Sequence, residues 1–327
     1  MPDDVAEEKV KALEALGADI ERVRPASIVD KKQYVNLARD YALHFTTSNA
    51  KTHGPTHDPH SHPRALKRSQ SSVVVTTADS LADEFAAELN GAADTPQTEE
   101  ELRTKPRGFF ADQFENQSNF DAHFDGTGPE IWRQTNGEAV AFVSGAGTGG
   151  TLAGCGQFLK TMNEDITVAL ADPEGSGLYN KVKHGVMYDH RESEGTKRRH
   201  QVDTVVEGIG INRLTKNIQL ALPIIDEAFR ITDAEAVSMS RFLVQHDGLF
   251  LGSSSACNLM ACVKLVKKMG WNSGEKIVTI LCDSGTRHYS KFWNDEYLAN
   301  AGIPIDVGIV QDLLTQPFPP VSSITKI

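Results

Sequence analysis

A glycine-rich loop between a buried strand and a helix constrains this chain more than any other feature. The run AVAFVSG (139–145) is apolar enough for a buried strand, and TLAGCGQFLKTM (151–162) has the pattern of a helix. Between them stands AGTGG, whose glycines let backbone N–H groups approach an anion closely. The N-terminus of the following helix adds partial positive charge. We call residues 145–151 the glycine loop; it predicts a phosphate site, with a tight turn that binds no ligand as the alternative.

Two kinds of phosphate ligand fit the glycine loop. The nucleotide P-loop is excluded, because no GK[ST] ending follows. The loop also satisfies the GxGxxG pattern of dinucleotide-binding proteins, and the next apolar stretch ends at Asp172, where an acid could bind a ribose. From these residues alone, a dinucleotide, as in a nicotinamide-dependent dehydrogenase, and a single phosphate both stay open.

The order of the other segments predicts an α/β fold. ITVALADPEG (166–175) and EKIVTILCDSG (275–285) have the character of buried strands, and helices are expected within 231–248 and 255–270. Apolar strands that alternate with helices indicate a doubly wound, mainly parallel sheet that is covered on both faces.

Charge and cysteine content exclude several classes of protein. The formal net charge of −11 argues against nucleic-acid binding. No apolar run approaches the ~18 residues of a membrane-spanning helix, and the first residues lack the features of a secretory signal. The four cysteines have no metal-ligand spacing, which favours a reducing compartment. No metal site is expected, because four neighbouring histidines lie in a proline-rich tract and are expected to be solvated: His53, His57, His60 and His62.

Several motifs in order carry a family resemblance. SGAGTGGTLAG, ALADPEGS, VVEGIG and ILCDSG, with DQFENQSNFDAHFDGTGPEIWRQ upstream, resemble the cysteine synthase/cystathionine β-synthase family of fold-type-II pyridoxal-phosphate enzymes, especially its fungal members. The resemblance covers roughly residues 1–43 and 108–300. It implies a tryptophan-synthase-β-like fold, pyridoxal 5′-phosphate as cofactor, and a homodimer if the chain is complete. The implied reaction is β-replacement on O-acetyl-L-serine by sulfide, which gives L-cysteine.

The resemblance also assigns residues to the cofactor phosphate. The family's GTGGT loop holds this phosphate through backbone N–H groups and threonine hydroxyls. It matches Gly147, Thr148, Gly149, Gly150 and Thr151 of this chain. For Thr151, an ordinary helix cap is the alternative role.

Further residues are matched to the cofactor ring and the substrate. Ser284 in CDSG matches the serine at the pyridine nitrogen, and a turn residue is the alternative. Gln113 matches the glutamine that binds the amino-acid carboxylate. Gly208 and Gly210 match a loop that closes over cofactor and substrate, although a purely structural turn explains these glycines equally well.

Two family segments are expected upstream of Met1, so the chain is expected to be N-terminally truncated. One is the SxKDR-type motif, whose lysine binds the cofactor covalently; the other is the TSGNTG-type substrate loop. Residues 27–32 and 46–49 resemble them only faintly, because their lysines are out of register or their glycines are missing. No catalytic lysine is therefore expected in this chain. A catalytically inactive pseudoenzyme is the main alternative function, and cystathionine β-synthase or dehydratase activity would use the same scaffold.

Four parts are expected along the chain. The first should be a remnant of the family's smaller domain, with helices within 4–17 and 33–44 and a strand at 18–24. The second is rich in Ser, Thr, His and Pro and should be a mostly disordered insertion. The third is the large cofactor-binding domain, and the fourth a tail. The expected limits are 1–43, 44–107, 108–312 and 313–327. A cytoplasmic location is expected, with the mitochondrion as the alternative if an N-terminal anchor has been lost.

Overall fold

The computed structural model describes four stretches of the chain, residues 1–26, 30–43, 108–188 and 204–317. The chain divides into two compact units, Met1–Tyr34 with Asp112–Ile327, and Val35–Ala111. The limits expected for the four parts stay predictions, because the whole of the expected insertion lies outside the described residues.

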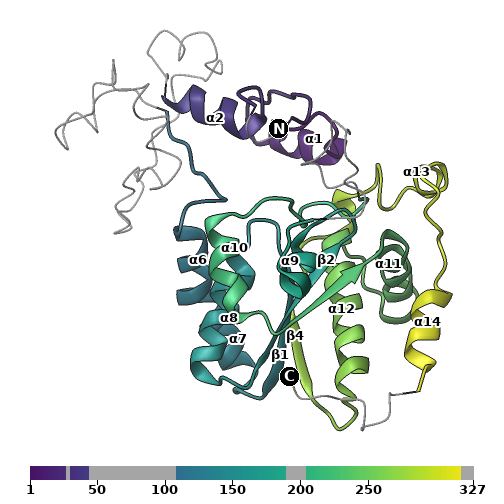
Figure 1. Cartoon of the computed structure of the whole chain (residues 1–327). Coiled ribbons are helices and arrows are strands. Elements are labelled where there is room, and N and C mark those ends of the chain that lie inside the picture. The colour runs from purple at the N-terminus through teal and green to yellow at the C-terminus, as the bar shows by residue number, and fades with distance from the viewer. Residues whose placement is uncertain (27–29, 44–107, 189–203, 318–327) are drawn as a thin grey trace, which may run out of the picture. The chain divides into compact units, whose positions relative to one another are not determined.

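The first unit contains a four-stranded parallel sheet (Figure 1). Its strands are β1 (Ala139–Gly145), β2 (Thr167–Pro173), β3 (Glu227–Ile231) and β4 (Lys276–Thr279), in the order β3-β2-β1-β4. The prediction of an α/β fold with a parallel sheet is confirmed. β4 is shorter than the apolar run suggested, because the chain beyond it leaves the sheet and pairs with an earlier segment through an isolated bridge between Leu251 and Ser284.

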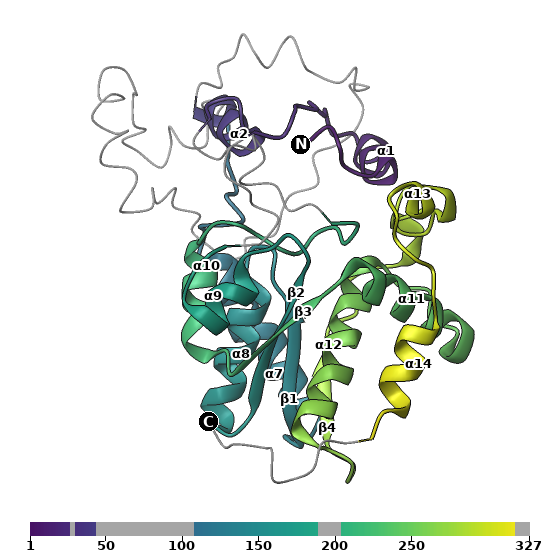
Figure 2. The ribbon, with the colours of Figure 1, turned by 45° about the vertical axis from the view of Figure 1, so that its right-hand side comes forward.

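Helices cover both faces of this sheet (Figure 2). α8 (Gly150–Met162) packs with α6 (Ser118–Ala122), the π-helical turn η1 (His123–Thr127), α7 (Gly128–Gln134) and α10 (Lys216–Ala221). On the opposite face, α12 (Ser253–Met269) crosses the strands, and α11 (Asp233–Asp247) and α14 (Gly308–Thr315) pack outside it. The shorter elements are α9 (Leu178–His184), η2 (Leu222–Ile224), η3 (Gly285–Arg287) and α13 (Asp295–Asn300).

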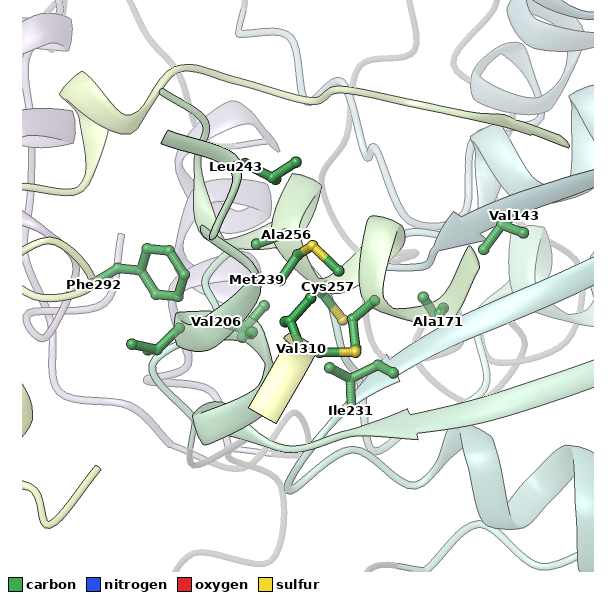
Figure 3. Close-up of a cluster of buried hydrophobic side chains, with 14 of the residues drawn as sticks. Val143, Ala171, Val206, Ile231, Met239, Leu243, Ala256, Cys257, Phe292 and Val310 are labelled. Atoms are coloured by element: carbon green, nitrogen blue, oxygen red, sulfur yellow. The ribbon is translucent and has the colours of Figure 1, made fainter. Parts of the chain in front are cut away.

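Each strand buries side chains on both faces of the sheet. In β1, Ala141 and Val143 enter the core cluster beneath α11 and α12, which also contains Met239 and Cys257 (Figure 3). Phe142, between them in sequence, points to the other cluster, beneath α8. A strand whose alternate residues enter two cores has to be apolar throughout, which is why β1 shows no alternation of polar and apolar residues.

The strand order places a topological switch point at β1. From β1 the chain moves outward through β2 to β3, and then returns to the other side of β1 as β4. The crossover from β1 to β2, through α8, lies on one face of the sheet, and the crossover from β3 to β4, through α11 and α12, lies on the other. Ligands of open α/β sheets bind at such a point.

The N-terminal stretch is only partly as expected. α1 (Glu7–Ala15) lies within the predicted range 4–17, and it ends before Gly17, whose φ of 83° a helix cannot continue through. The expected strand at 18–24 is not formed; only a bridge between Pro2 and Val23 exists. A strand needs a neighbouring strand for its backbone groups, and Val23 pairs here with the first residues of the chain instead.

All of α2 (Tyr34–Leu43) except its first residue belongs to the second unit, and its bounds are close to those of the helix predicted at 33–44. Gly108 packs against this helix so tightly that a Cβ there would lie 2.5 Å from the carbonyl oxygen of Ala42. Across both units, no helix among the described residues is long and apolar enough to cross a membrane.

Candidate active site

The glycine loop follows β1 and leads into α8 at the switch point. Gly149, the residue before the helix, has a φ of 92°, which side-chain-bearing residues rarely adopt. A Cβ on Gly147 would lie 2.5 Å from the carbonyl oxygen of Gly208, and one on Gly150 would lie 2.1 Å from Asn119 Oδ1. Backbone conformation and close neighbours thus both require glycine here.

The glycine loop contains backbone N–H groups that have no protein acceptor among the described residues. Within the described structure, no protein group accepts a hydrogen bond from the N–H of Gly147, Thr148, Gly149 or Thr151. These donors surround the N-terminus of a 13-residue helix that has no side-chain cap. Several unsatisfied N–H groups at the positive end of a helix form an anion site, so the loop fits a phosphate group.

Two side chains hold the threonine hydroxyls of the glycine loop. Asn119 Nδ2 donates to Thr148 Oγ1 at 2.9 Å, and His123 Nε2 lies 3.1 Å from Thr151 Oγ1. Burial lowers the pKa of His123, which favours the neutral ring at neutral pH. If Thr151 donates its hydroxyl hydrogen to a phosphate, Nε2 of His123 has to carry the ring proton. His123 Nδ1 then accepts from Thr127 Oγ1, 3.0 Å away.

Close helix packing brings these two side chains to the glycine loop. A Cβ on Gly154 of α8 would lie 2.5 Å from the carbonyl oxygen of Phe120. α6 and η1 therefore lie so close to α8 that only a glycine fits at position 154. Sequence reasoning missed Asn119 and His123 as site residues. Their spacing of four, which puts both on one face of a helix, was the available signal.

Gln113 lies beside the glycine loop. Asn119 Nδ2, which donates to Thr148, also donates to the carbonyl oxygen of Gln113 at 2.8 Å. Asn217 Nδ2 donates to the carbonyl oxygen of Phe114 at 3.0 Å and fixes the same segment from α10. Gln113 itself is exposed. Its backbone is thus fixed next to Asn119, the residue that also holds Thr148.

The segment with Gly208 and Gly210 also lies against the glycine loop. The N–H of Gly210 donates to the carbonyl oxygen of Ala146 at 2.9 Å, and the carbonyl of Gly208 faces Gly147. Both glycines have φ near 90°, at 89° and 90°. The structural role of these glycines is thus seen directly, and it places them at the edge of the site.

Ser284 stands just beyond β4, whose neighbour is β1. Its Oγ accepts from the N–H of Thr286 at 3.3 Å and from Thr286 Oγ1 at 3.1 Å, and it caps the short helix η3. Because Ser284 accepts in both contacts, its own hydrogen is available to an acceptor such as a pyridine nitrogen. The turn role and the proposed ring contact are therefore compatible.

The carboxylate next to Ser284 is engaged by a buried histidine. His288 Nε2 lies 2.9 Å from Asp283 Oδ2, and His288 is only 2% exposed. Burial alone would raise the pKa of Asp283, but the hydrogen bond from His288 and the charges of His288, Lys9 and Arg287 together hold it below its ordinary value. Asp283 thus stays ionised at neutral pH.

Asp172 does not suit the dinucleotide interpretation. Its side chain is fully buried, and Oδ2 accepts from the N–H of Tyr179 at 2.7 Å, near the start of α9. An acid that binds a ribose has to be accessible to the ligand. Asp172 instead ties α9 to the end of β2.

The remaining candidate residues lie mostly outside the described part of the chain. Within the described parts of the chain, no three His, Cys, Asp or Glu side chains are arranged to hold a metal ion. The histidine tract around 53–62 lies outside the described residues, as does the string at 46–49 and part of that at 27–32.

Residues 55–283 match the family model described as "Pyridoxal-phosphate dependent enzyme". The chain belongs to this family. Pyridoxal phosphate is thus the cofactor that the phosphate-binding loop of a member is expected to serve, and the resemblance inferred from the motifs is confirmed.

Relatives within this pyridoxal-phosphate dependent family carry the name cysteine synthase. The chain is 48% identical over 303 residues to cysteine synthase 2 of Schizosaccharomyces pombe, covering 93% of this chain and 63% of that protein. It is 47% identical to cysteine synthase 2 of Emericella nidulans over 90% of this chain and 58% of that protein. Mouse cystathionine beta-synthase is 32% identical over 60% of this chain and 32% of its own length. The chain spans less than two thirds of each.

The four cysteines of this family member are expected to differ sharply in reactivity. Burial raises the pKa of Cys155 and Cys262 to about 12, and that of Cys257 well above its ordinary value, whereas Cys282 is exposed. The thiolate is the reactive form, so one thiol should react with Ellman's reagent in the native protein and four in denaturant. Cys282→Ser should remove the native signal. Rapid labelling of Cys257 in the folded chain would contradict the core packing.

Proposed function

We propose that this chain forms the phosphate- and ring-binding part of a cysteine synthase, which replaces the acetate of O-acetyl-L-serine with sulfide. One observation supports this most: unsatisfied N–H donors of the glycine loop lie at the same switch point as Ser284, with Gln113 beside them. A compact ligand with a phosphate at one end and a ring nitrogen at the other suits these groups.

Each group has a distinct proposed task. The N–H groups of residues 147–151 and the hydroxyls of Thr148 and Thr151 hold the phosphate. The Ser284 hydroxyl donates to the ring nitrogen. Pyridoxal phosphate, when bound, supplies the electron sink for chemistry at the substrate's α-carbon. A neutral hydroxyl leaves that nitrogen unprotonated, and the weaker sink favours elimination and replacement over transamination. Gln113 binds the substrate carboxylate through a neutral amide.

The names of the relatives do not decide whether sulfide or homocysteine is the acceptor. The two cysteine synthase 2 relatives from Schizosaccharomyces pombe and Emericella nidulans match 93% and 90% of this chain, against 60% for mouse cystathionine beta-synthase. We therefore propose sulfide as the acceptor, with homocysteine as the second candidate. A homodimer and the compartment stay predictions from the resemblance.

Ligand titration of the purified chain tests the proposed cofactor site. Pyridoxine 5′-phosphate, which lacks the reactive aldehyde, should bind saturably and be displaced by inorganic phosphate. Pyridoxine without the phosphate should bind at least about tenfold more weakly, since it loses the charge-assisted hydrogen bonds to the loop. NAD should not compete, because Asp172 is buried. Equal affinity for the two pyridoxine compounds would remove the phosphate site from the proposal, and tight NAD binding would favour the dehydrogenase alternative.

A further inference from the structure

Three buried polar side chains near the start of α12 bind the backbone of segments that lead to the predicted site residues. Ser253, Ser255 and Asn258 are 0%, 0% and 1% exposed. Ser253 Oγ accepts from the N–H of Glu207 at 3.1 Å, and Ser255 Oγ accepts from the N–H of Cys282 at 2.8 Å. The first turns of one helix thus contact both the segment before Gly208 and the segment before Ser284.

Asn258 joins the two ends of the site directly. Its Oδ1 accepts from the N–H of Gly145 at 2.7 Å, where β1 enters the glycine loop. Its Nδ2 donates to the carbonyl oxygen of Ile280 at 3.0 Å, on the segment that leads to Ser284. A side-chain amide carries an acceptor oxygen and a donor nitrogen on one carbon, so it can make both hydrogen bonds at once. Neither serine nor leucine can do this.

α12 is itself a rigid reference for these contacts. Ala256 and Cys257, between the polar residues, are fully buried in the core cluster under α11 (Figure 3). The helix has no side-chain cap of its own, and a Cβ on Gly252 would lie 1.8 Å from Asp283 Oδ1. The ionised Asp283 therefore sits against the positive end of α12, a further link between this helix and the Ser284 segment.

We propose that Asn258, assisted by Ser255, is a positioning residue that sets the separation between the glycine loop and Ser284. The inference rests on the proposed cofactor site. A ligand that binds both ends at once gains affinity only if the two ends are held at the spacing of its own groups. If that spacing is no longer fixed, a ligand that contacts both ends loses affinity. A ligand that contacts only one end keeps its affinity.

Three probes separate this role from a general structural one. Pyridoxine 5′-phosphate tests both ends together, inorganic phosphate tests the glycine loop, and pyridoxine tests the ring end. Asn258→Leu should weaken pyridoxine 5′-phosphate by about tenfold or more while changing phosphate and pyridoxine affinities by less than about twofold. Ser255→Ala should act in the same direction more mildly. If circular dichroism and thermal unfolding show that Asn258→Leu does not fold, the Ser255→Ala variant provides the test instead.

The matched control lies between these positions. Ser254 is buried in the same helical turn, and its side chain has no hydrogen bond recorded within the described structure, so Ser254→Ala should leave all three affinities unchanged. Equal losses for pyridoxine 5′-phosphate and inorganic phosphate in folded Asn258 and Ser255 variants would overturn the positioning role, as would unchanged affinities. If the parent chain binds none of the probes, the proposed site fails and this inference fails with it.

Discussion

Gly147→Ala is expected to weaken binding of pyridoxine 5′-phosphate by roughly 100-fold, the equivalent of two charge-assisted hydrogen bonds of about 1.5 kcal/mol each. The new Cβ would lie 2.5 Å from the carbonyl oxygen of Gly208, so the glycine loop or the Gly208 segment has to move. Such a shift turns the N–H donors away from a common phosphate position. Isothermal titration of both proteins measures the effect.

The change should affect stability far less than affinity. Gly208 is not fully buried and its own neighbourhood is open, so relaxation should cost about 1 kcal/mol of unfolding free energy. Gly126→Ala provides the matched control, since a Cβ there meets nothing within 4 Å and its φ is not positive. Unchanged affinity in Gly147→Ala, or an equal loss in Gly126→Ala, would remove the glycine loop from the proposed site.

Substitution of Gly149 is a poorer test, although the motif alone suggests it. A Cβ there would lie 2.6 Å from Ile218 Cδ1 and 2.9 Å from the Ile218 nitrogen, and the φ of 92° would be strained. Ile218 is buried in the core beneath α8. Gly149→Val should therefore lower both affinity and folding stability, and the two effects could not be separated.

The second large effect concerns turnover: the 327-residue chain by itself should form no measurable cysteine from O-acetyl-L-serine and sulfide. The family's reaction requires a lysine amine that binds the cofactor covalently and later removes the substrate's α-proton, a task that needs a base within about 3 Å of that carbon. No lysine of this sequence is matched to that motif.

Lysines near the predicted site residues, such as Lys9 and Lys216, are not expected to substitute. Lys9 of α1 forms an ion pair with Glu207 at 2.6 Å, beside Gly208. Lys216 follows Thr215, whose hydroxyl donates to the carbonyl oxygen of Thr148 at 3.0 Å. Lys9 is held by its carboxylate, and Lys216 begins α10 with an exposed side chain. Neither stands on a segment that the family motif assigns to the reacting carbon.

Turnover can be measured with and without the expected upstream segment. Fusing the N-terminal part of the Schizosaccharomyces pombe relative to the chain should produce cysteine, whereas the chain alone should not. The same fusion with its motif lysine changed to alanine is the matched control. Turnover by the chain alone, together with a borohydride-stabilised cofactor adduct at one lysine such as Lys9 or Lys216, would show that the catalytic lysine lies within these 327 residues.

The sequence alone determined the local framework of the site. β1 and α8 begin and end where the apolar runs and the glycines predict, because strand, turn and helix preferences act over a few residues. The same local pattern predicted an anion site at residues 145–151 but left its ligand open. Only motifs separated by many residues, through their resemblance to a family, pointed to pyridoxal phosphate.

The tertiary structure decided what depends on contacts between distant segments. The strand order β3-β2-β1-β4 makes β4, which leads toward Ser284, a neighbour of β1, which leads into the glycine loop. Asp172 is buried and bound to the start of α9. The roles of His123 and Asn258 likewise follow from helix packing that no local pattern encodes. A hydrogen bond between residues 28 or 113 positions apart depends on how the core packs, so only the folded chain reveals it.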